Sequence, residues 1–352
     1  MLEHVKGNLL QADAEALVNT VNTVGVMGKG IALQFRQAYP ENFNAYQAAC
    51  KRGEVQPGRM FVFQTGRLDN PGYIINFPTK RHWKGQSRME DVETGLTALV
   101  AEVRERGIRS IAVPPLGCGN GGLDWEDVRQ RIEAAFAELP EVQVLLFSPE
   151  GAPLAEEMHV NTKRPNMTPG RAAVVSLIKQ YKLPGYRVTI LEIEKLAYLL
   201  QECGQALKLN FEKGEYGPYT ETLHPVLQRI EGHFIRGYGD RSGRASIHLL
   251  PGADMEAEEF LEEDAVTREH LGRVAQLIEG FETPYSLELL TTVHWVAHYE
   301  EPLAGSDVDV AIRCVHAWNE RKKQFRPEHI RIAWQRLADQ GWLVTDSAVS
   351  VE

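Results

Sequence analysis

The sequence has few cysteines and no long apolar run. Cys50, Cys118, Cys203 and Cys314 lie far apart, and none of them belongs to a Cys-x-x-Cys pair. This spacing argues against a zinc ribbon and a disulfide scaffold, and it fits a reducing cytoplasm. No apolar segment comes close to the length of about 20 residues that a membrane helix needs. The N-terminus lacks the apolar core of a secretory signal. We therefore expect a cytoplasmic protein without a membrane partner.

The chain also lacks an excess of positive charge. Residues 1–150 hold 16 Lys and Arg against 18 Asp and Glu, whereas residues 151–352 hold 22 against 30, and the net charge is −10. A protein that coats nucleic acid generally needs net positive charge. Any contact with nucleic acid must therefore be local.

The length of 352 residues favours two domains, at roughly 100–200 residues per domain. In the first part, apolar runs typical of strands buried on both faces alternate with helical stretches. We expect strands at 60–63, 73–77, 111–113 and 142–147, and helices near 31–39, 41–52, 89–106 and 124–138, with Asp124 as an N-cap. This alternation predicts a three-layer α/β domain over residues 1–155.

Proline and polar residues interrupt the apolar pattern over residues 156–168, which we interpret as a linker. Residues 169–352 form a second, mostly α-helical domain in this interpretation, because leucines recur there at helical spacing. Two short β-like segments, 234–235 and 246–250, flank a Gly/Arg-rich turn at 237–244.

The first candidate site follows a strand that ends in polar residues. The segment Val18-Asn19-Thr20-Val21-Asn22 leads through Gly25-Val26-Met27-Gly28-Lys29-Gly30 into a helix. Glycines let the backbone approach a ligand closely, and the start of the helix offers N–H groups to an anion. The segment is not a Walker loop, and a flexible turn without a ligand is the alternative.

The second candidate site is the glycine-rich segment 114–122. Gly117, Gly119 and Gly122 match Gly-x-Gly-x-x-Gly, which makes a Rossmann dinucleotide site one interpretation. That fingerprint belongs in the first βαβ unit with an acidic residue about 20 positions later, whereas here no acid precedes Glu150 in the next strand. The remaining alternatives are a cradle of N–H groups for a phosphate or diphosphate and a turn without a ligand.

The third candidate site is Lys80, which follows the strand at 73–77, where ligands bind in α/β sheets. Burial or nearby cations lower the pKa of a lysine and make it a nucleophile. The available cations are Lys29, Arg81, His82 and Lys84. The same loop joins cations to the indole of Trp83, a combination that holds a phosphate backbone and stacks a base. The alternatives are a solvated basic loop and a Trp83 that packs on its own domain.

Together these motifs resemble those of a macrodomain, the ADP-ribose-binding fold. They are Gly7-Asn8-Leu9, Ala16–Asn22, Gly28–Ala32 and Pro115–Gly119. Phe77-Pro78-Thr79-Lys80 is similar to the branch related to terminal ADP-ribose glycohydrolases, which uses a lysine here; residues 41–46 and 58–60 also fit. Within that branch the chain resembles the DarG antitoxins of DarT–DarG pairs. The resemblance implies a three-layer α/β macrodomain with a mixed sheet, followed by a toxin-binding domain.

The resemblance also implies a substrate and a set of site residues. In that family the toxin ADP-ribosylates thymine in single-stranded DNA and the antitoxin releases the ADP-ribose. We expect Lys80 to act at the anomeric carbon and Asn22 to orient the ribose, with no cofactor and no metal. The expected ADP-ribose contacts are Asn8, Leu9, Thr20, Val21, Asn22, Gly28, Gly30, Ile31, Thr79, Gly117, Cys118, Gly119, Asn120 and Gly121, and the DNA contacts are Arg81, His82, Trp83 and Lys84.

The sequence departs from the family pattern at two positions. Many macrodomains have an aspartate where this chain has Asn8, and relatives with the lysine carry an aspartate where this chain has Asn120-Gly121. Asp124 is a candidate replacement for that second carboxylate. In the second half, Lys195–Leu199 and Tyr216–Tyr219 resemble the SocA-like (Panacea) antitoxin domain.

The second half also contains an acidic segment, with seven carboxylates between Asp254 and Asp264. We expect Glu258, Glu259, Glu262 and Glu263 to bind the basic DNA groove of a DarT-like toxin. The alternative is a solvated helix face. For the whole chain, the alternatives to a glycohydrolase are a non-catalytic ADP-ribose reader, which has no use for Lys80, and a Rossmann-type NAD-dependent oxidoreductase.

Overall fold

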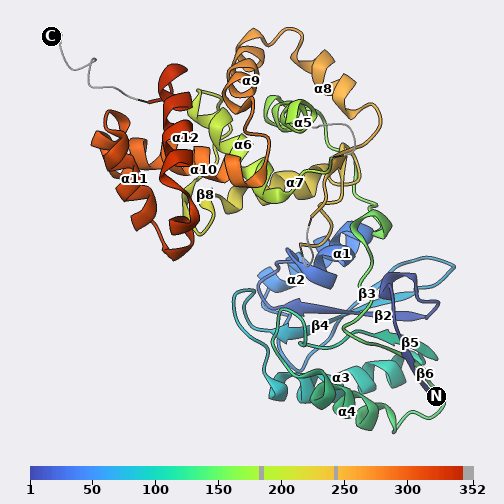
Figure 1. Ribbon diagram of the computed structural model, residues 1–352. Helices are drawn as coiled ribbons and strands as arrows, with labels where there is room; N and C mark the ends of the chain where they lie inside the picture. The colour runs from blue at the N-terminus through green and yellow to red at the C-terminus, as the bar shows by residue number, and fades with distance from the viewer. Residues whose placement is uncertain (182–185, 242–244, 344–352) are drawn as a thin grey trace. The chain divides into compact units, whose positions relative to one another are not determined.

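The computed structural model describes residues 1–181, 186–241 and 245–343 (Figure 1). The chain forms two compact units. The first comprises Met1–Lys163 together with Gly239–Gly243, and the second comprises Arg164–Tyr238 and Arg244–Glu352. A short segment of the second half of the sequence therefore belongs to the first unit.

A six-stranded mixed sheet organises the first unit. Its strands are β1 (Leu2–Val5), β2 (Ala16–Asn22), β3 (Phe61–Gln64), β4 (Tyr73–Lys80), β5 (Ser110–Val113) and β6 (Gln143–Phe147). They lie in the order β1-β6-β5-β2-β4-β3, and every neighbouring pair is parallel except β3 and β4. The mixed sheet confirms the predicted fold class.

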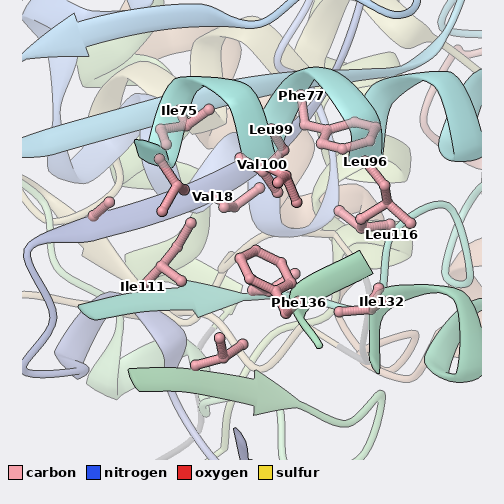
Figure 2. Close-up of a cluster of buried hydrophobic side chains, with 14 of the residues drawn as sticks. Val18, Ile75, Phe77, Leu96, Leu99, Val100, Ile111, Leu116, Ile132 and Phe136 are labelled. Atoms are coloured by element: carbon pink, nitrogen blue, oxygen red, sulfur yellow. The ribbon is translucent and has the colours of Figure 1, made fainter. Parts of the chain in front are cut away.

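Helices cover both faces of this sheet. They are α1 (Gly30–Ala38), α2 (Pro40–Lys51), α3 (Met89–Arg106) and α4 (Trp125–Phe136). Successive strand residues point to opposite faces: Val18 of β2 packs with Leu96 of α3 and Phe136 of α4 (Figure 2), whereas Leu17 packs with Phe35 of α1. The predicted three layers and four helices are confirmed.

Local hydrogen bonds explain where two elements begin. The Asp124 side chain accepts from the Asp127 N–H at 3.1 Å and caps α4, as predicted. The 3₁₀ helix η1 (Leu9–Gln11) begins after Asn8, whose side chain accepts from the Leu10 N–H at 3.0 Å. The capping role already explains why residue 124 is an aspartate. The structure therefore gives no support to Asp124 as a replacement for the aspartate that relatives carry in the second glycine loop.

The second unit is largely helical, as predicted. Its helices are α5 (Pro169–Tyr181), α6 (Ile190–Glu202), α7 (His224–Ile230), α8 (Ala253–Leu261), α9 (Ala265–Ile278), α10 (Pro284–Trp295), α11 (Val308–Ala317) and α12 (Pro327–Asp339). Two antiparallel pairs join β7 (Glu212–Gly214) to β8 (Gly217–Tyr219), and β9 (Ile235–Arg236) to β10 (His248–Leu249). Across residues 1–181, 186–241 and 245–343, we find no helix with the length and apolar composition needed to cross a membrane.

Short helices complete both units. They are η2 (Ala155–Glu157), η3 (Glu221–Leu223), the π-helical η4 (Val296–Glu300), η5 (Pro302–Gly305) and η6 (Glu320–Gln324). In the motif that resembles the SocA-like domain, the Lys195 amine on α6 donates to the Pro218 carbonyl of β8 at 2.6 Å. This contact joins the two parts of the motif. The predicted turn at 237–244 is described only as far as residue 241.

Candidate functional site

Lys80 is the last residue of β4, at the carboxyl edge of the sheet. Strand pairing places it opposite Asn22 of β2, with a register irregularity at that point. The hydroxyl of Thr23 donates to the Arg81 carbonyl at 2.6 Å and ties the segments that follow the two strands together. The polar end of β2 and the predicted catalytic lysine therefore lie side by side.

The amine of Lys80 donates to the Asn120 carbonyl in the second glycine loop. Burial lowers the pKa of Lys80, and the nearby charge of Lys29 lowers it further. Of the cations proposed from the sequence, Arg81 instead pairs with Asp91 at 3.0 Å. The lowered pKa therefore depends on the partial burial of Lys80 and on Lys29.

The two glycine loops meet beside Lys80. A Cβ atom built at Gly30 would lie 3.1 Å from the side-chain amide nitrogen of Asn120. In the second loop, the Cys118 N–H donates to the Pro115 carbonyl at 3.2 Å, and the contact of Cys118 with ADP-ribose stays a prediction. Among the residues that the structure describes, no hydrogen bond is recorded for the N–H groups of Gly119, Asn120 and Gly121.

The first glycine loop is held by Asn22. Its amide nitrogen donates to the Val26 carbonyl at 2.5 Å, and its side-chain oxygen accepts from the N–H groups of Val24 and Val26 at 3.0 and 3.3 Å. The buried hydroxyl of Tyr46 adds a bond to the Asn22 carbonyl at 2.6 Å. In this arrangement Asn22 shapes the loop, and its contact with a ribose stays a prediction.

The start of α1 has a hydrogen-bond partner from far along the chain, and its contact with ADP-ribose stays a prediction. The Gly30 N–H, predicted to bind a diphosphate, donates to the Asp240 carbonyl at 2.8 Å. A phosphate cannot accept that hydrogen while Asp240 holds it. The Asp240 carboxylate also accepts from the Gln34 side chain on α1, 206 positions away in the sequence. Local sequence patterns do not indicate contacts over such a separation.

The other predicted contacts lie in three settings. Leu9, Val21 and Thr79 are buried, and Val21 packs in a core cluster, so a ligand would meet its backbone. The Asn8 side chain caps η1, and its adenine contact stays a prediction. Partly exposed positions are Thr20, Gly28 and Ile31.

The loop after Lys80 is exposed. Trp83 exposes 48% of its surface, which argues against a tryptophan that packs on its own domain. The Lys84 amine lies 5.0 Å from the centre of the Trp83 ring, and the His82 ring lies 5.6 Å from it. The Trp83 indole, flanked by Lys84 and His82, remains open to a further ring.

Comparison with known proteins defines the class and then the family. Residues 18–132 match the Macro domain family, so the first unit is a macrodomain. The chain is 49% identical over 97% of its length to the DNA ADP-ribosyl glycohydrolase of Thermus aquaticus, of which it covers 94%. It is 43% identical over 96% of its length to that of Mycobacterium tuberculosis, of which it covers 99%. The chain belongs to the DNA ADP-ribosyl glycohydrolase (DarG) family, whose members are hydrolases.

Two further relatives extend the comparison. The solved macrodomain of Thermus aquaticus DarG is 60% identical, covers 42% of this chain and 99% of its own, and gives a TM-score of 0.41. A DNA ADP-ribosyl transferase–DNA ADP-ribosyl glycohydrolase fusion protein of Thermosipho africanus is 34% identical over 163 residues, which are 42% of each chain. Because the chain belongs to a glycohydrolase family, the oxidoreductase alternative is wrong.

Proposed function

We propose that this protein releases ADP-ribose from thymine bases of single-stranded DNA by hydrolysing the N-glycosidic bond. The observation that carries the proposal is the position of Lys80, with its lowered pKa, between Asn22 and the second glycine loop. The names of the relatives of Thermus aquaticus and Mycobacterium tuberculosis support this activity. A non-catalytic reader would have no use for such a lysine.

We propose a position for the ligand from the groups that converge on Lys80. The diphosphate lies on the N–H groups of Gly119 to Gly121, and the distal ribose lies between the end of β2 and Lys80. Lys80 then acts at the anomeric carbon, either as an attacking amine that forms an imine or as an ammonium group that stabilises charge on the departing base. Both roles break the bond between the anomeric carbon and the base, which leaves with a proton. Water then hydrolyses the imine in the first role, or attacks the anomeric carbon directly in the second, and supplies the new hydroxyl of ADP-ribose.

The loop from Arg81 to Lys84 is the proposed contact with the DNA strand. Stacking of a base on an exposed aromatic ring contributes about 1–3 kcal/mol, and Trp83 is open to such a contact. Lys84 and His82 beside the ring can hold a phosphate. Arg81 contributes less charge, because Asp91 neutralises it.

The test uses the full chain and single-stranded DNA that carries ADP-ribosylated thymine. The parent protein should release free ADP-ribose. Lys80→Ala should abolish release but still bind ADP-ribose, and borohydride should trap an adduct on Lys80 if the amine attacks. Trp83→Ala should slow release from DNA by about tenfold, given the stacking energy, and leave ADP-ribose binding unchanged. Release by Lys80→Ala at the parent rate would exclude the proposed role.

We also propose that the second unit binds and neutralises a DarT-like toxin. The fusion of a DNA ADP-ribosyl transferase with a DNA ADP-ribosyl glycohydrolase in Thermosipho africanus supports such a partnership. Of the four glutamates expected to bind the toxin, Glu258 pairs with Lys179 at 2.6 Å. Glu259, Glu262 and Glu263 are exposed, and no ion pair is recorded for them among the described residues.

Charge reversal tests this surface. Changing Glu259, Glu262 and Glu263 to Lys should slow association of the full chain with the toxin, most strongly at low salt. Glu258→Lys is the matched comparison and should have a smaller effect, because Lys179 already offsets that charge. If the triple variant inhibits the toxin as well as the parent does, the acidic segment is only a solvated face.

A further inference from the structure

The first turn of α1 is capped by a residue from far along the chain. The backbone carbonyl of Asp240 accepts from the Gly30 N–H at 2.8 Å, and its carboxylate accepts from the Gln34 side chain at 2.6 Å. The residue before the helix, Lys29, makes no side-chain cap. Asp240 therefore supplies the acceptor that the start of a helix requires.

The segment that carries Asp240 is fitted closely to the first unit. Asp240 exposes only 4% of its surface. Gly239 has a φ of +62°, and a Cβ atom at this position would lie 2.9 Å from the Cβ of Ala155. The backbone can follow this path because residue 239 is a glycine.

The start of a helix attracts anionic groups, and each of its N–H groups donates to one acceptor. Its N–H groups and its dipole favour a carboxylate or a phosphate there. At α1 the carbonyl of Asp240 already takes the Gly30 hydrogen, and the carboxylate lies one helical turn away, on Gln34. A diphosphate that reached this position would lose the Gly30 donor and meet a buried negative charge.

We propose that Asp240 is an internal competitor for the diphosphate of ADP-ribose at the start of α1. ADP-ribose engages both glycine loops only when the segment Gly239–Arg241 leaves α1. The inference rests on the proposed function, because it takes ADP-ribose as the ligand. Because the two equilibria are coupled, any interaction that stabilises the segment on α1 weakens ADP-ribose binding. ADP-ribose in turn weakens the contact of the segment with α1 by the same free energy.

Calorimetry on the full chain with ADP-ribose tests this competition. Asp240→Ala removes the carboxylate that anchors the segment, and Gly239→Val sets a side chain against Ala155. Each should tighten ADP-ribose binding by about threefold to tenfold, the range expected for the loss of one ordinary hydrogen bond. Asp254→Ala, which removes a partly exposed carboxylate paired with Lys179 instead, should leave the affinity unchanged.

Stability measurements separate competition from mere support of the fold. Asp240→Ala should lower the melting temperature of the ligand-free protein while it raises the affinity for ADP-ribose, whereas a purely structural role would lower both. In the parent, ADP-ribose should speed hydrogen exchange at the amides of 239–241. Unchanged or weaker binding by both variants, or slower exchange at these amides, would overturn the proposal. Release from modified DNA is measured separately, so failure of the glycohydrolase assay does not affect this result.

Discussion

At the residue scale, the pKa of Lys80 makes a prediction about pH. Burial and the charge of Lys29 lower this pKa, and only the neutral amine can attack. If Lys80 is the nucleophile, kcat/KM should rise as the pH increases through the lowered pKa. Lys29→Gln removes a nearby cation, so the pKa of Lys80 and the midpoint of the profile should move to higher pH.

Lys84→Gln is the control for this profile, because Lys84 lies over the Trp83 ring and is not among the causes of the shift. Its midpoint should equal that of the parent. A rate that falls with increasing pH would instead assign Lys80 the electrostatic role, since that role needs the ammonium form. An unchanged midpoint in Lys29→Gln would disprove the coupling between the two lysines.

The position of Lys80 could be predicted from sequence, whereas the state of its neighbours could not. A lysine that follows a buried apolar strand lies at the carboxyl edge of a parallel sheet, independently of the conformation of the loops. The bonds of Asn22 to Val24 and Val26 are local, whereas its bond from Tyr46 and the Asp240 cap on α1 depend on tertiary contacts. No local pattern specifies those contacts.

At the element scale, Gly119 and Gly121 of the second loop are expected to respond differently to substitution. A Cβ atom at Gly119 meets nothing within 4 Å, whereas one at Gly121 would lie 2.2 Å from the Gly117 carbonyl oxygen. Gly119→Glu should therefore fold normally and lose ADP-ribose binding, because its carboxylate enters the phosphate cradle. Gly121→Ala should lose about 1–3 kcal/mol of stability through overpacking.

Thermal unfolding and calorimetry on both variants check this pair. An unchanged ADP-ribose affinity in Gly119→Glu would show that the diphosphate does not lie on this loop. A Gly121→Ala protein as stable as the parent would show that the loop can rearrange, and that its backbone does not provide a fixed cradle.

Long apolar elements were predictable, and short ones were not. Helices α2 to α4 follow the expected ranges, and β4 contains the expected strand 73–77 and continues to Lys80, because each buries a continuous or periodic apolar face. The four-residue strand β1 was not predicted, since its central residues Glu3 and His4 are exposed. It forms because β6 offers a parallel edge to pair with.

At the scale of the whole molecule, the sequence gives the net charge of each half, but it does not show which charged side chains are buried. The sequence shows an acidic second half, but it does not reveal that Glu288 and Lys322 are almost fully buried. They pair at 2.7 Å, and Arg321 adds a second bond to Glu288 at 3.0 Å. Buried ions of this kind are specified by the packing of several helices at once, which a one-dimensional pattern does not contain.

This buried cluster predicts a large loss of stability when its only carboxylate is neutralised. Glu288→Gln leaves the buried Lys322 ammonium without its ion-pair partner, and removal of one partner from a buried pair costs about 3–5 kcal/mol. Burial lowers the pKa of Lys322 while Glu288 raises it, so without Glu288 the pKa should fall further. Folding then opposes protonation of Lys322 more strongly, and the loss of stability should be greater at acidic pH than at alkaline pH.

Urea unfolding followed by tryptophan fluorescence measures this loss, because the Trp318 ring lies 5.6 Å from the Lys322 amine. The matched control is Glu320→Gln, whose carboxylate pairs with Lys323 at 2.5 Å while its side chain is 87% exposed. Exposed pairs contribute about 0–1 kcal/mol, so the control should unfold close to the parent. Equal midpoints for the two variants would mean that the buried cluster adapts to the loss of its carboxylate. A midpoint shift confined to Glu288→Gln, and larger at acidic pH, would establish that this carboxylate stabilises the second unit by balancing a cation that the fold has removed from water.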